Sequence, residues 1–142
     1  LATSHPGSQF IFPVHLNPKI SEHVQATLGM IKNVHLVKPV SYEVFCYLLD
    51  AAYLVLTDSG GVQEEAPSLG KPVLVMRENT ERPEAVTAGT VRLVGADSKR
   101  IIAGTEELLT DSDLFKKMSQ AHNPYGDGNA AMRIAEIIRR SL

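Results

Sequence analysis

Residues 53–76 read YLVLTDSGGVQEEAPSLGKPVLVM, a pattern that indicates a strand, a helix and a second strand. The nearly continuous apolar run Tyr53–Thr57 is typical of a central parallel strand that is covered on both faces. The next segment, Gly61–Leu69, predicts a helix that ends at Gly70, and Pro72–Met76 predicts a second strand. Because the helix carries the chain back to the same end of the sheet, the two strands are expected to be parallel.

The same alternation of strand and helix continues on both sides of this unit. Further strands are predicted at Phe10–His15, Val34–Val37 and Thr90–Val94. Four further helices are predicted at Pro18–Met30, Ser98–Thr110, Asp113–His122 and Asn129–Arg140. Another helix is predicted after Ser41, which can cap it, and its apolar stripe consists of Val44, Phe45, Leu48, Leu49 and Ala52. This order predicts an α/β fold with one Rossmann-like, doubly wound parallel sheet. Because no repeat, linker or low-complexity tract interrupts it, we interpret residues 1–142 as one domain.

The composition excludes several classes of protein. Hydrophobic residues make up 44% and charged residues 21% of the 142 residues, which excludes a disordered chain. Lys and Arg total 14 and Asp and Glu total 16, so the net charge of −2 gives no overall positive field for nucleic acid or an anionic membrane surface. The single cysteine, Cys46, has apolar neighbours and is interpreted as a buried, inert thiol in a reducing compartment. No apolar run approaches the roughly 20 residues of a membrane-spanning helix.

The strongest candidate for a ligand site follows the predicted strand that ends at Thr57. Ligands of parallel sheets bind outside the carboxyl ends of the strands, and here Ser59, Gly60 and Gly61 lead directly into a helix. Two glycines allow a ligand to approach the backbone, while the free N–H groups, the helix dipole and the Ser59 hydroxyl favour a phosphate. The alternative is a helix that Ser59 simply caps, with glycines that ease a tight turn.

Charged residues near this turn suggest further contacts. Glu65 lies more than one turn inside the helix, where its carboxylate can accept hydrogen bonds from a ribose diol. The alternative for Glu64 and Glu65 is a solvated pair that complements the helix dipole, and this is the preferred interpretation of Glu64. Pro83 suits the first turn of a helix and leaves Arg82 at its entrance, where a guanidinium can bridge two phosphate oxygens. As an isolated charge cluster, the Arg82 segment would more often be a solvated loop, but its position after a predicted strand favours a site.

Other candidate residues follow the first two predicted strands. The run 38–45, KPVSYEVF, offers a restrained backbone and an aromatic ring for a planar base, although the apolar pattern around Phe45 favours core packing. His15 lies in a turn at a strand end, where a packed and a surface histidine are equally expected. The five histidines lack the spacing of a metal site, so no metal is predicted.

Four longer motifs carry a family resemblance. They are PVHLNP at 13–18, LTDSGGVQEEAPSLGKPVLVMR at 56–77, TERPEA at 80–85 and NPYGDG at 123–128. Together they resemble the C-terminal half of the bacterial non-hydrolysing UDP-N-acetylglucosamine 2-epimerases. The resemblance implies that residues 1–142 are the C-terminal, UDP-binding domain of a two-domain enzyme of glycosyltransferase-B architecture. The start at Leu1, without an initiator methionine, also leads us to expect a longer protein with its own N-terminal domain.

The resemblance also implies roles for individual residues. The implied UDP contacts are Ser59, Gly60 and Gly61 to the diphosphate, Glu65 to the ribose hydroxyls, Arg82 to a phosphate, and Val40 and Phe45 to the uracil. Because the family can carry a polar residue where Val40 stands, valine leaves only a backbone or packing contact to the base. His15 resembles a family histidine near a second, regulatory UDP-sugar position. The family's acid/base carboxylates lie in the N-terminal domain, so no catalytic residue is assigned to this chain.

The implied reaction is the reversible conversion of UDP-N-acetylglucosamine to UDP-N-acetylmannosamine. UDP is eliminated to leave a glycal and is then re-added, with C2 protonated on the opposite face, and no cofactor is expected. The resemblance implies a cytoplasmic isomerase that supplies surface polysaccharides and is a homodimer at full length. This chain alone is expected to bind UDP weakly and not to epimerise. The alternatives are the donor-binding domain of a UDP-sugar glycosyltransferase and a non-catalytic nucleotide-binding module.

Overall fold

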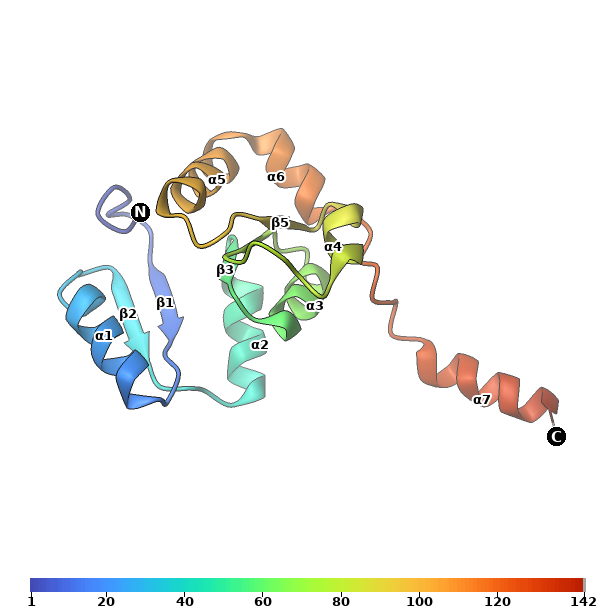
Figure 1. Ribbon diagram of the computed structural model, residues 1–142. Helices are drawn as coiled ribbons and strands as arrows, with labels where there is room; N and C mark the ends of the chain where they lie inside the picture. The colour runs from blue at the N-terminus through green and yellow to red at the C-terminus, as the bar shows by residue number, and fades with distance from the viewer. Residues whose placement is uncertain (142) are drawn as a thin grey trace. The chain divides into compact units, whose positions relative to one another are not determined.

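A computed structural model describes residues 1–141 and contains two parallel sheets (Figure 1). The chain divides into two compact units, here called unit 1 (Leu1–Leu48) and unit 2 (from Leu49 onward). Helix α2 (Tyr42–Ala51) runs across this boundary. Each unit is a small α/β layer with its own sheet.

Unit 1 contains one strand–helix–strand unit. Strands β1 (Phe10–Pro13) and β2 (Val34–Val37) pair in parallel over their full length. Helix α1 (Pro18–Leu28) connects them, and it begins where the Asn17 side chain accepts a hydrogen bond from the Lys19 N–H. Asparagine at the cap followed by proline in the first turn is a favoured helix start.

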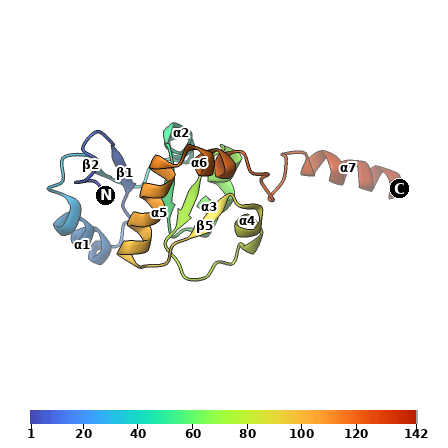
Figure 2. The same ribbon diagram turned by 90° about the horizontal axis from the view of Figure 1, so that it is seen from above.

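Unit 2 contains a three-stranded parallel sheet in the order β3-β4-β5. Its strands are β3 (Val55–Thr57), β4 (Val73–Val75) and β5 (Val91–Leu93), and its helices are α3 (Gly60–Ser68), α4 (Pro83–Ala88), α5 (Ser98–Thr110), α6 (Ser112–Ser119) and α7 (Ala130–Ser141). Figure 1 shows α5 and α6 over one face of this sheet and α3 on the opposite face, and Figure 2 gives the view from above. Because helices cover both faces, the central strand β4 is completely buried.

The core of unit 2 lies between β4 and the helices α5 and α6. Its buried side chains are Leu74, Val94, Leu108 and Met118. Helix α5 approaches the sheet closely because Gly104 has no side chain: a Cβ there would lie 3.1 Å from Val94 Cγ1. This packed core holds the carboxyl ends of β3 and β4 in place, and the candidate site is built on those ends.

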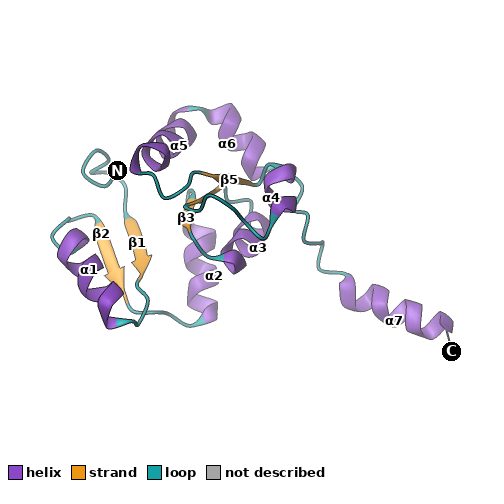
Figure 3. Cartoon of the chain, in the orientation of Figure 1, coloured by secondary structure: helices purple, strands orange, loops and turns teal. Residues whose placement is uncertain are grey.

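The predicted elements are present, with shorter bounds in most cases (Figure 3). Helix α5 has the predicted bounds, and α4 begins at Pro83 as expected. The strand predicted from Tyr53 begins at Val55, and the Tyr53 ring instead stacks on Phe115 with ring centroids 4.2 Å apart. Cys46 is half-buried, so the expectation of a buried thiol was wrong.

The predicted single sheet is instead two sheets. Strand β1 pairs with β2, and β3 pairs with β4. An apolar run indicates an extended, covered segment, but it does not specify which neighbour pairs with each edge. In β1 the side chains of Ile11 and Phe12 are exposed, unlike those of the fully covered β4. Within residues 1–141, no helix is long and apolar enough to cross a membrane.

Candidate functional site

The turn between β3 and α3 forms the centre of the candidate site. The buried Thr57 hydroxyl accepts a hydrogen bond of 3.0 Å from the Ser59 N–H, which fixes the turn directly after the strand. Ser59 is the N-cap residue of α3, but its side chain makes no capping hydrogen bond. The sequence alternative is therefore right about the position of Ser59 at the start of the helix, but the side-chain hydrogen bond of a capping serine is not made. The first N–H groups of α3 keep their donor capacity and the positive end of the helix dipole for an anion.

The two glycines at the start of α3 provide space. Neither Gly60 nor Gly61 has a positive φ, so the backbone conformation does not require glycine at either position. A Cβ at Gly61 would meet no heavy atom within 4 Å among the described residues. A Cβ at Gly60 would lie 2.5 Å from Glu81 Oε1. Gly60 therefore admits a carboxylate, and Gly61 leaves the backbone open to a ligand.

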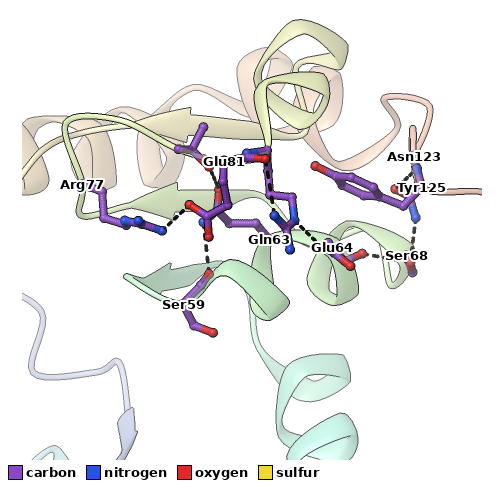
Figure 4. A network of polar contacts seen from close by, with 10 residues as sticks. Ser59, Gln63, Glu64, Ser68, Arg77, Glu81, Asn123 and Tyr125 are labelled. Carbon is purple, nitrogen blue, oxygen red and sulfur yellow. Dashed lines mark hydrogen bonds and ion pairs between the residues drawn. The ribbon is translucent and has the colours of Figure 1, made fainter.

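A buried glutamine joins α3 to the loop before α4. Gln63 is completely buried, and its Nε2 donates to the Ser59 carbonyl at 3.1 Å. Its Oε1 accepts a hydrogen bond of 2.6 Å from the Thr80 hydroxyl, and Thr80 Oγ1 accepts the Arg82 N–H at 3.0 Å (Figure 4). These bonds hold residues 80–82 against the first turn of α3. Sequence reasoning missed Gln63, although its spacing from the buried Ala66 and Pro67 places it on the covered face of the helix.

Arg82 lies at the start of α4, as predicted, and is paired with Glu64. Its Nε donates to Glu64 Oε1, and its Nη1 donates to the Glu81 carbonyl at 3.3 Å. The Glu64 hydrogen bond, and then the charges of Glu64 and Glu81, raise the pKa of Arg82 against the opposing effect of burial. The expectation that Glu64 is merely solvated was wrong. The pairing was not visible in the sequence because helix periodicity contains no information about a partner 18 positions away.

Glu81 forms a second ion pair beside Gly60. Its Oε2 lies 2.7 Å from Arg77 Nη1 (Figure 4). A hydrogen bond to its own backbone N–H, followed by the charges of Arg77 and Arg82, lowers the pKa of Glu81 against the effect of burial. Glu81 is therefore held as a carboxylate at the start of α3.

The NPYGDG segment lies along the other end of α3. Asn123 Nδ2 donates to Ser68 Oγ at 2.6 Å, and Asn123 Oδ1 accepts the Tyr125 N–H at 3.2 Å. The buried Tyr125 hydroxyl has no hydrogen-bond partner among the described residues. Burial, together with the charges of Glu84 and Glu64, raises the pKa of Tyr125. Figure 4 shows the Tyr125 ring on the Glu64 side of the network.

Glu65 remains available on α3. It is half-buried, and its carboxylate makes no hydrogen bond or ion pair within residues 1–141. Glu64 and Glu65 thus differ, because only Glu64 is engaged by Arg82. Glu65 lies on the same helix as Gly60 and Gly61, and its contact with a ribose stays a prediction.

The remaining predicted residues belong to unit 1. Val40 and Phe45 are half-buried, so Phe45 is not a core residue. His15 is exposed, and its Nδ1 accepts the Asn17 N–H at 3.1 Å. A hollow of about 250 Å³ follows the carboxyl ends of β1 and β2, and His15 and Pro39 are among its lining residues. No group of three or more His, Cys, Asp and Glu residues with the geometry of a metal site is found in the described part of the chain.

Comparison with known proteins assigns the family. The sequence model described as UDP-N-acetylglucosamine 2-epimerase matches residues 1–139. The chain belongs to the UDP-N-acetylglucosamine 2-epimerase family. It is 57% identical over 141 residues, or 99% of its length, to the UDP-N-acetylglucosamine 2-epimerase of Escherichia coli strain K12. The predicted resemblance is therefore confirmed.

Solved structures also share the fold. The UDP-GlcNAc 2-epimerase of Neisseria meningitidis, bound to UDP-GlcNAc, superimposes with a TM-score of 0.91 at 47% identity over 98% of this chain. The S. aureus MnaA structure with UDP gives a TM-score of 0.86 at 44% identity over 94% of this chain. The α/β, Rossmann-like architecture of glycosyltransferase-B type is thus confirmed. The chain spans 38% of the length of the Escherichia coli epimerase.

Proposed function

We propose that this chain is the C-terminal, UDP-binding domain of a two-domain enzyme that interconverts UDP-N-acetylglucosamine and UDP-N-acetylmannosamine. The observation that carries this proposal is the uncapped start of α3, with open space at Gly61 and Arg82 nearby. The chain is 57% identical to a curated 2-epimerase, and this identity supports the choice of the reaction. In this account the natural protein is a cytoplasmic homodimer, and its N-terminal domain completes the active site.

The proposed role of this chain is to hold the leaving group. The N–H groups of Gly60 and Gly61 and the Ser59 hydroxyl donate to the diphosphate, and Arg82 adds a positive charge. When the bond between sugar C1 and the diphosphate oxygen breaks, negative charge develops on that oxygen, and these fixed donors stabilise it. The proton at C2 is removed and returned on the opposite face by groups outside this chain. The chain alone is therefore expected to bind UDP without epimerising the sugar.

The other contacts of the nucleotide are proposed from the same family relationship. Glu65, whose carboxylate is unpaired within residues 1–141, accepts hydrogen bonds from the ribose hydroxyls. Val40 and Phe45, both half-buried, contact the uracil. His15, beside the hollow that follows β1 and β2, contributes to a second, regulatory UDP-sugar position.

Arg82 provides the direct test of the phosphate assignment. Arg82→Ala removes a cation from the proposed diphosphate site, so UDP affinity is expected to fall by about tenfold. Arg92→Ala is the matched control. Arg92 also pairs with a glutamate, Glu107, but it lies on β5 and is not a predicted phosphate contact. The measurement is calorimetric titration of both variants and the unsubstituted chain with UDP. If the two variants bind UDP with equal affinity, Arg82 is not a phosphate-binding residue.

The reaction itself is tested in the natural protein that carries this chain. Incubation with UDP-N-acetylglucosamine and no acceptor is expected to yield UDP-N-acetylmannosamine. A requirement for an acceptor would favour the glycosyltransferase alternative. UDP binding with neither reaction would favour the non-catalytic nucleotide-binding module.

A further inference from the structure

The carboxylate of Glu81 lies where an anion would meet the start of α3. Glu81 Oε1 is 2.5 Å from the position of a Cβ on Gly60, the first residue of that helix. The helix dipole gives this end a partial positive charge, which favours an anion within the first turn. The proposed diphosphate and the Glu81 carboxylate therefore require the same region.

Neighbouring residues hold Glu81 in this place. Arg77 Nη1 binds the other carboxylate oxygen, Oε2, at 2.7 Å. The residues before and after Glu81 are fixed as well, because Thr80 donates to the buried Gln63 and the Arg82 N–H donates to Thr80. The loop is thus anchored to α3 through Gln63, which also bonds to the Ser59 carbonyl.

This arrangement has an electrostatic consequence for anion binding. A diphosphate at Gly60 and Gly61 would lie next to the negative charge of Glu81, and two like charges this close repel each other even though the Glu81 side chain is 47% exposed and solvent screens part of the effect. Arg77 is a second cation beside this position, in addition to Arg82, and its Nη1 is occupied by Glu81. The carboxylate therefore both repels the incoming phosphate and keeps Arg77 from it.

We infer that Glu81 is an internal competitor of the diphosphate, which displaces the Glu81 carboxylate from Gly60 and takes over its pairing with Arg77. This inference rests on the proposed function and adds two residues to the same site. Glu81 sets how weakly the site holds an anion, and Arg77 is a further phosphate-binding residue. Such competition weakens UDP binding, which suits a site that must release and recapture its leaving group during turnover.

Glu81→Gln tests the inference because it removes the charge and keeps the size of the side chain. Glu78→Gln is the matched control: Glu78 is in the same loop and pairs with Arg100 at 3.0 Å, but it approaches Gly95 instead of Gly60. Both variants change the net charge of the chain by the same amount. The probes are UDP, inorganic pyrophosphate and uridine, titrated calorimetrically into this chain.

For Glu81→Gln, the affinities for UDP and for pyrophosphate are expected to rise by about tenfold, and the increase should shrink at high salt. The affinity for uridine should stay the same, and Glu78→Gln should match the unsubstituted chain. Glu81→Ala, which also removes the obstruction, should raise the affinities at least as much. If UDP binds normally but Glu81→Gln and Glu78→Gln behave alike, the inference is overturned and the proposed function stands. If no variant binds UDP, both are overturned.

Discussion

Gln63 is the residue on which the arrangement of the site depends most. It is the buried member of a chain of hydrogen bonds that runs from the Ser59 carbonyl to the Arg82 N–H. A buried polar side chain is costly unless its hydrogen bonds are made, and here both ends of the amide are bonded. The same bonds fix the loop that carries Glu81 and Arg82. Stability and ligand geometry therefore depend on one side chain.

Replacement of Gln63 by leucine tests this dependence. Gln63→Leu removes the donor to the Ser59 carbonyl and the acceptor of the Thr80 hydroxyl proton, so the free energy of unfolding is expected to fall by about 2 kcal/mol. Gln25→Leu, at an exposed position of α1, should change it by less than about 0.5 kcal/mol. Urea denaturation followed by circular dichroism measures both. An equal effect of the two substitutions would mean that the Gln63 network does not support the fold.

The sequence predicted the single-residue features that depend on local spacing. Ser59 and Arg82 were expected at helix starts, and both are N-cap residues. The pairings of Glu64 with Arg82 and of Gln63 with Thr80 were not expected, because their partners are 18 and 17 positions apart and belong to different elements. Local rules describe which backbone positions begin a helix, but they do not identify the side chains that meet between α3 and the start of α4.

At the scale of elements, the helices and strands follow the apolar periodicity closely. Differences occur at the ends, where side-chain bonds decide the boundary. Helix α6 begins at Ser112, one residue before the prediction, because the Asp111 side chain accepts the N–H groups of Asp113 and Leu114. The pattern of apolar residues does not predict such caps, although Asp is a favoured capping residue.

The start of α7 has a charge-dependent contact of its own. Asp127 precedes this helix and forms two hydrogen bonds with Arg133, of 2.9 and 2.6 Å. The Arg133 guanidinium, followed by the side chain and the backbone N–H of Asn129, lowers the Asp127 pKa from 3.8 to about 2. Because the folded-state pKa is below the unfolded one, the contact stabilises α7 above pH 3.8 and is lost as the pH falls through about 2.

Asp127→Asn provides the matching test for α7. Above about pH 4 this variant should have a lower helix content in residues 130–141 than the unsubstituted chain, because the charged partner of Arg133 is missing. As the pH falls toward about 2, the difference should disappear. Cα chemical shifts of α7 report the helix content. A difference that stays constant with pH would show that the Asp127 charge does not stabilise this helix.

At the scale of the whole molecule, alternation of strands and helices predicted the α/β class and parallel pairing. Both are present, in sheets β1-β2 and β3-β4-β5. The division into two sheets was not predictable, since local patterns do not encode which strand edges pair. The family resemblance predicts UDP from four motifs, whereas residue chemistry alone predicts a phosphate at the helix start and Arg82 and a ribose at Glu65, and leaves the base open. The two lines of reasoning converge on the start of α3.

We propose that the start of α3 binds the diphosphate of UDP. A titration of the ¹⁵N-labelled chain with UDP, followed through the backbone amide resonances of its glycines, tests this proposal. The Gly60 and Gly61 amides are expected to show large, saturable downfield shifts, with little change at Gly104 in the core helix α5. Binding of UDP with the Gly60 and Gly61 resonances unchanged would contradict it.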